Sequence, residues 1–158
     1  MKLSFNKDNL MNGINIVLKA VSSKTTMPIL ECILIDATSN EIKLTGNDME
    51  LGIETKVEGM ILERGKIALD AKLLSDIIRK LSGDESLITI ESDEKFNTVI
   101  TCEKSVFKIQ GKDGEEFSRY IIIGRRFRKQ NSCMCYYLSH DFIIRLERLL
   151  YVKIVLKK

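Results

Sequence analysis

The chain has 158 residues, 44% of them hydrophobic and 30% charged, a balance typical of one soluble globular domain with its own core. No apolar run approaches the roughly 20 residues that a membrane span requires, and the start lacks the long apolar stretch of a signal peptide, so we expect a cytoplasmic protein. The formal net charge of +3 is unevenly divided: residues 1–118 hold 15 Lys/Arg against 20 Asp/Glu, and residues 119–158 hold 10 against 2.

A pattern at the start of the chain returns 64 residues later. Each copy has an alternating apolar strand, a residue suited to a helix N-cap (Asn6, then Asp70), and apolar residues at helical spacing. Coincidence between two common patterns is the alternative, since repeats are usually sought at shorter periods. The matched pairs are Leu3 with Ile67, Phe5 with Leu69, Asn6 with Asp70, Leu10 with Leu74, Ile14 with Ile78 and Val17 with Leu81.

Each predicted helix is followed by three predicted strands. The first helix is expected to end near Val21, before a polar loop that closes on the only proline, Pro28. Strands are predicted at 29–37, 41–45 and 49–57, with turns at 38–40 and 46–48 between them. The second helix, 71–81, precedes strands at 86–92, 98–102 and 106–110.

Two copies of a strand, a helix and three strands predict an α+β domain. We expect two helices packed on one face of antiparallel sheet, with the other face in solvent. Beyond Ser118 no strand and turn pattern resumes, so residues 1–118 are predicted to form the domain and residues 119–158 a basic tail.

Four segments, in order and at matching spacing, carry a resemblance to a known family. They resemble the first domain of the bacterial sliding clamp, the beta subunit of DNA polymerase III, and the 64-residue repeat agrees with the pseudo-two-fold symmetry of that DNA clamp fold. The resemblance covers residues 1–117. The segments are VLKAVSSKTTMPIL (17–30), LTGNDME (44–50), AKLLSDIIRKL (71–81) and GKDGEEF (111–117).

The resemblance implies a non-catalytic processivity factor. In that family two three-domain chains close into a ring around double-stranded DNA, and a pocket on the later domains takes peptides from the DNA polymerase and the clamp loader. The sequence lacks a match to the later domains, so the chain is expected to be truncated and unable to form the ring alone.

A clamp holds DNA without reading its sequence, so it needs positive charge near the phosphates and few base contacts. On the second helix Lys72 and Arg79 are seven residues apart and share the solvent side, which we expect also to hold Ser75, Asp76 and Lys80. Near the first helix, Lys19 precedes Lys24, which sits where the resemblance places a DNA-contacting basic side chain. The predicted DNA-binding residues are Lys24, Arg79, Lys72 and Lys19; an ordinary solvated helix surface is the alternative.

The resemblance also implies sheets that continue across domain and subunit boundaries. The last predicted strands, 98–102 and 106–110, are therefore expected to offer unpaired backbone groups to other clamp domains or subunits. Alone, the domain is expected to associate weakly with itself.

The tail admits three interpretations. Its abrupt loss of acidic residues and periodicity favours a frame-shifted readthrough of a longer clamp gene, and a natural short form is the rival. Alternatively the tail is the functional part: Arg125, Arg126, Arg128 and Lys129, around Phe127, could bind nucleic acid or an anionic membrane surface.

The sequence gives little support for an enzymatic function. The four cysteines form no secreted-type disulfide framework, and Cys32 and Cys102 are predicted core residues. Cys133, Cys135 and His140 could suggest a zinc site, but a fourth ligand is missing from this segment. His140 is also the only histidine, so a nucleophilic pair would require it. We expect no catalysis, cofactor or metal.

Overall fold

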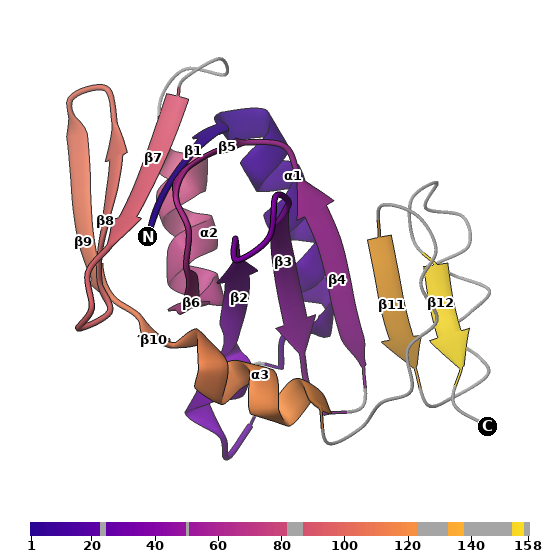
Figure 1. Ribbon diagram of the computed structural model, residues 1–158. Helices are drawn as coiled ribbons and strands as arrows, with labels where there is room; N and C mark the ends of the chain where they lie inside the picture. Colours follow the sequence, from indigo (N-terminus) through magenta and orange to yellow (C-terminus); the bar gives the residue numbers. More distant parts are fainter. Residues whose placement is uncertain (23–24, 50, 82–86, 123–132, 138–152, 157–158) are drawn as a thin grey trace.

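The computed structural model describes residues 1–22, 25–49, 51–81, 87–122, 133–137 and 153–156 (Figure 1). The first unit consists of β1 (Lys2–Asn6), α1 (Lys7–Val17), the 3-10 helices η1 (Leu18–Ala20) and η2 (Pro28–Glu31), β2 (Cys32–Asp36), β3 (Ile42–Asn47) and β4 (Gly52–Val57). The second follows β5 (Met60–Glu63) and consists of β6 (Lys66–Asp70), α2 (Ala71–Lys80), β7 (Leu87–Ser92), β8 (Asn97–Cys102) and β9 (Ser105–Gln110). Then come β10 (Lys112–Asp113), α3 (Gly114–Ile122), β11 (Cys133–Tyr137) and β12 (Lys153–Leu156). No helix in these ranges is long and apolar enough to cross a membrane.

The two units exchange their first strands. β1 pairs with β7 in a five-stranded sheet of order β5-β1-β7-β8-β9, and β6 pairs with β2 in a seven-stranded sheet of order β10-β6-β2-β3-β4-β11-β12. Strand β1 therefore completes the sheet of the second unit, and β6 that of the first. The predicted α+β domain with an internal repeat is confirmed, with two sheets rather than one.

The repeat offset changes along the unit. It is 64 for the first strands, which begin at Lys2 and Lys66, and 55 for the strands that begin at Cys32 and Leu87. The difference of nine arises because the connection from helix to strand, residues 18–31 in the first unit, is shorter in the second, residues 81–86, and because α1 is one residue longer than α2.

One large core fills the space between the sheets and the two helices. Alternate residues of β1, such as Leu3 and Phe5, and the inner side of α1, such as Leu10 and Ile14, are fully buried in it. Cys102 belongs to this core and Cys32 to a second cluster, so both are buried free thiols as predicted.

Several predicted boundaries shift for local reasons. The strand predicted at 29–37 begins only at Cys32, because Pro28 opens the 3-10 helix η2. The predicted turn at 46–48 begins later, since Gly46 lies within β3, where a Cβ would collide with the carbonyl oxygen of Val17. Helix α1 ends at Val17 and continues as η1, and β5 was not predicted.

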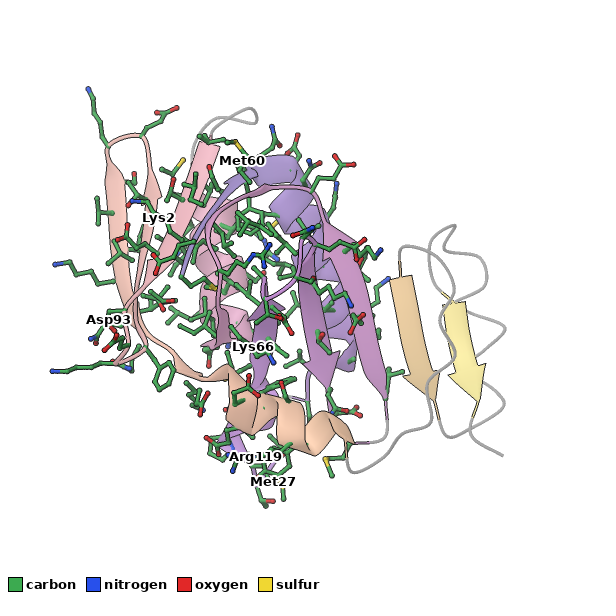
Figure 2. All side chains as sticks on the ribbon, in the orientation of Figure 1. Lys2, Met27, Met60, Lys66, Asp93 and Arg119 are labelled. Carbon is green, nitrogen blue, oxygen red and sulfur yellow. The ribbon has the colours of Figure 1, made fainter. Side chains whose placement is uncertain are left out.

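Helix α3 covers part of the outer sheet face, at β2 and β6, which was predicted to meet solvent. Figure 1 shows α1 behind β3 and β4, and α3 in front, near the lower end of β2. Phe117 of α3 is fully buried against Leu34 and Ala68 in the second hydrophobic cluster. At the side of this cluster Lys66 Nζ, labelled in Figure 2, lies 3.0 Å from Glu115 Oε1 and 3.5 Å from Asp36 Oδ2.

The described residues of the tail include two short strands, although no strand pattern was expected there. β11 pairs antiparallel with β4, and β12 pairs parallel with β11. Helix α3 runs through Ser118, the position at which the composition changes. The basic cluster at 125–129 lies outside the described residues.

Candidate nucleic-acid interface

Helix α2 presents a charged face because most of its apolar residues point the other way, with Leu73, 45% exposed, as the exception. Its N-cap is the predicted Asp70, whose carboxylate accepts a hydrogen bond of 2.7 Å from the backbone N–H of Leu73. Leu74, Ile77 and Ile78 recur at helical spacing and are buried. The cap fixes where the helix begins, and the buried stripe fixes which side faces outward.

Three cations lie on the outward side of α2. Lys72, Arg79 and Lys80 are exposed, and Lys72 and Arg79 are seven residues, about two turns, apart. Arg79 Nη2 donates to Ser75 Oγ at 3.4 Å, which directs the guanidinium along the helix. Ser75 itself is 4% exposed, so its expected place on the solvent side is wrong. Lys80 is the cation that the predicted binding set omitted.

Helix α1 packs beside α2 but exposes mostly uncharged groups. The side chain of Asn6, its predicted N-cap, accepts a hydrogen bond of 2.9 Å from the backbone N–H of Asp8. The exposed residues are Asp8, Asn12 and Asn15, followed by Lys19 in η1. The exposed positive charge of these helices is therefore concentrated on α2 and at Lys19 in η1.

A hollow of roughly 740 Å³ lies between η1 and α2. Lys72 and Arg79 line it on the α2 side, and Leu18 and Val21 on the η1 side. Three carboxylates, Glu31, Asp70 and Asp76, also line it. Their charge opposes the cations at short range, so the face is basic along its outer rim rather than throughout.

The structure brings Lys72 and Arg79 together along one hollow, and the exposed Lys19 lies in η1, whose Leu18 lines the same hollow. Lys24 lies outside the described residues. Lys80 could have been found from the sequence, because it directly follows Arg79 in the last turn, where cations also complement the helix dipole.

Of the two strands predicted to offer an edge for association, only β9 lies at the edge of its sheet. β9 ends the five-stranded sheet and exposes Val106 at 56%. β8, predicted with it, lies between β7 and β9 and is paired on both sides. The expectation of unpaired backbone groups at 98–102 is therefore wrong.

The three residues that were weighed and rejected as a zinc site are only partly described. Cys133 and Cys135 lie two residues apart on β11, and His140 lies outside the described residues. Within the described ranges no three His, Cys, Asp or Glu residues form a group that could hold a metal ion.

Two features define a clamp-type α+β domain. Each unit lends its first strand to the sheet of the other unit, and one of the two helices, α2, is basic on its outer side. The chain belongs to the family of the DNA polymerase III beta subunit, N-terminal domain, whose model matches residues 1–121. It is 38% identical over 125 residues to the beta sliding clamp of Staphylococcus epidermidis and 36% identical over 123 residues to that of Synechocystis. Each match covers 74% of this chain, but only 33% and 32% of the relatives, so the chain spans about a third of their length.

Solved structures of the same family resemble this chain. A DNA polymerase III beta subunit from Eubacterium rectale is 55% identical with a TM-score of 0.74, covering 84% of this chain and 34% of that one. The sliding clamp from Bacillus subtilis is 32% identical with a TM-score of 0.70, covering 83% and 34%.

Proposed function

We propose that this chain supplies the DNA-contacting share of a sliding clamp, holding double-stranded DNA through α1, η1 and α2 without reading its sequence. The observation that carries this proposal is the outward row of Lys72, Arg79 and Lys80 on α2 in a domain whose residues 1–118 are acidic overall. Phosphate contacts depend on local charge, because salt screens exposed charges beyond about 10 Å at 0.1 M ionic strength. Lys19 and Lys24 extend the proposed contact surface.

The wider role follows from the family. The chain corresponds to about a third of its relatives, so tethering a polymerase is proposed for the assembled clamp and not for this domain alone. Other clamp domains are proposed to join at the β9 edge, and the polymerase and clamp loader to bind elsewhere on the assembly. The proposed role is cytoplasmic and needs no catalysis, since a clamp makes and breaks no covalent bond.

Titration of a mixed-sequence duplex with the full chain between about 25 and 200 mM salt, followed by fluorescence anisotropy, tests the DNA face. Each phosphate contact contributes about 0.9 to the slope of log affinity against log salt concentration. We expect Lys72→Gln and Arg79→Gln each to weaken binding and lower that slope by about one contact. Lys19→Gln and Lys24→Gln should act in the same direction.

Lys108→Gln is the matched control. Lys108 is exposed on β9, between Phe107 and Ile109, which pack against the core, so its side chain leaves the sheet on the outer face. The Lys108→Gln variant should bind the duplex with the affinity and salt dependence of the wild type. If Lys108→Gln weakened binding as much as Lys72→Gln, the proposal would fail. Loss of binding only in Arg125→Gln/Arg126→Gln would assign it to the tail instead.

A further inference from the structure

The two sheets end differently. The five-stranded sheet ends in β9, and no further strand pairs with β9 among the described residues. In the seven-stranded sheet β4 would occupy the corresponding position, but β11 covers it. Figure 1 shows β11 beside β4, with β12 beyond it. The pairs are Cys133 with Thr55, Met134 with Glu54, Cys135 with Ile53 and Tyr136 with Gly52.

Uncovered, β4 would be a strong pairing edge. It has six residues and pairs along its whole length with β3 on the other side. Ile53, Thr55 and Val57 point into the buried side and hold the strand in a fixed register. A row of unpaired N–H and C=O groups on such a strand is a template for pairing with another chain.

We propose that β11 is an intramolecular cap, which occupies the β4 edge and prevents this sheet from pairing with another clamp domain or a second copy of the chain. The cap comes from the basic segment 119–158, so it gives that segment a role that does not involve DNA. The proposal concerns the partners of the sheet and does not depend on DNA binding by α1 and α2.

The number of open edges decides the type of assembly. With β4 capped, the described sheets end in β9 and in three short strands of two to four residues, β5, β10 and β12, and such short edge strands are poor templates for pairing. Association through β9 then pairs like edges and closes at a dimer. With both edges open, β9 of one copy can pair with β4 of the next, and such head-to-tail contacts continue into open chains when they do not close as a ring. The cap therefore limits the chain to small assemblies.

A disulfide tests whether the cap forms. Directly opposed residues of antiparallel strands have Cα atoms about 4.5 or 5.5 Å apart, within the range that a disulfide spans. Thr55→Cys should therefore cross-link to the native Cys133 under mild oxidation, with the bridge located by mass spectrometry of peptides. Cys133→Ser in the same background removes the bridge. Lys56→Cys is the register control, since its side chain leaves the opposite sheet face.

Proline tests what the cap does. Successive N–H groups of a strand point to opposite sides, so one of Met134 and Cys135 donates toward β4, and Met134→Pro/Cys135→Pro removes that bond in either case. Sedimentation of the full chain should then show assemblies of more than two copies. The oxidised Thr55→Cys chain, with the cap locked, should show fewer assemblies than the wild type.

Two results would overturn the proposal. One is a folded Thr55→Cys chain that forms no bridge to Cys133. The other is a proline variant whose mass distribution equals that of the wild type. DNA binding by both variants should match the wild type, because α1 and α2 are unchanged. Loss of DNA binding in Lys72→Gln with normal capping would concern the proposed function alone.

Discussion

Asn6 and Asp70 perform the same task at equivalent positions of the two units. Each side chain accepts a hydrogen bond from a backbone N–H in the first turn, at 2.9 Å in α1 and 2.7 Å in α2. We predict that Asn6→Ala and Asp70→Ala each lower the free energy of unfolding by about 1 kcal/mol, measured by urea denaturation. Asp70→Asn keeps an accepting oxygen and should stay close to the wild type. If Asp70→Asn lowered the free energy of unfolding as much as Asp70→Ala, the assignment of Asp70 as a helix N-cap would be contradicted.

Asp93 organises the turn between β7 and β8. The side-chain hydrogen bond from Asn97, with the backbone N–H donors of Asn97 and Lys95, outweighs desolvation and holds the pKa of Asp93 below its usual value of about 3.8. Figure 2 shows Asp93 at the lower end of these strands. A carboxyl with a lowered folded pKa stabilises the fold above its unfolded pKa, and this contribution disappears as the pH falls through the folded pKa.

We therefore predict that the turn loosens only below about pH 4. The amide signals of Lys95 and Asn97 should titrate together in an NMR pH series, with a midpoint below that of a free aspartate. Asp93→Asn should abolish this titration. A midpoint at or above the usual value would refute the hydrogen-bond assignment.

Local chemistry explains why such residues can be predicted. The caps depend on residue type and on the apolar spacing that follows them, and both are visible in the sequence. Ser75 was misplaced because the buried side of α2 is wider than a narrow apolar stripe, extending from Ala71 to Ile78. How far a helix sinks into its neighbours is a tertiary property.

Helix α3 is an element that the sequence did not reveal. It has nine residues, and Phe117 is the one fully buried side chain among residues 114–120, whose side chains the structure describes. A helix this short carries too few apolar repeats to be predicted from its spacing. We predict that Phe117→Ala lowers the free energy of unfolding by about 3–5 kcal/mol in urea denaturation, because it empties the cluster between α3 and β2.

Glu116→Ala, an exposed change on the same helix, is the control for this prediction and should stay within about 0.5 kcal/mol. A similarly small effect for Phe117→Ala would show that α3 does not stabilise the outer sheet face.

At the scale of the molecule the units depend on each other. β1 of the first unit pairs with β7 of the second, and β6 of the second pairs with β2 of the first. We predict that fragments 1–64 and 65–158 each lack a cooperative thermal transition by circular dichroism, and that mixing them restores it. Cooperative unfolding of fragment 1–64 alone would contradict this dependence.

The sequence repeat predicted two equivalent units but could not show the exchange between them. Alternating strands such as β1 and β6 carry the same pattern whichever sheet they join, since pairing partners are set by long-range packing. The same holds for the candidate site. The cations on α2 follow from helical spacing, whereas the hollow beside η1 depends on how η1 meets α2.

Chemical-shift mapping of the full chain with a short mixed-sequence duplex tests the central claim most directly. The claim predicts that backbone amide signals change along the exposed side of α1, through η1 and along α2, near Lys19, Lys72 and Arg79, and that added salt reverses the changes. Signals from the outer face of β8 and β9, near Lys108, should stay in place. Changes confined to that outer face or to residues 119–158 would contradict a DNA-binding helix face.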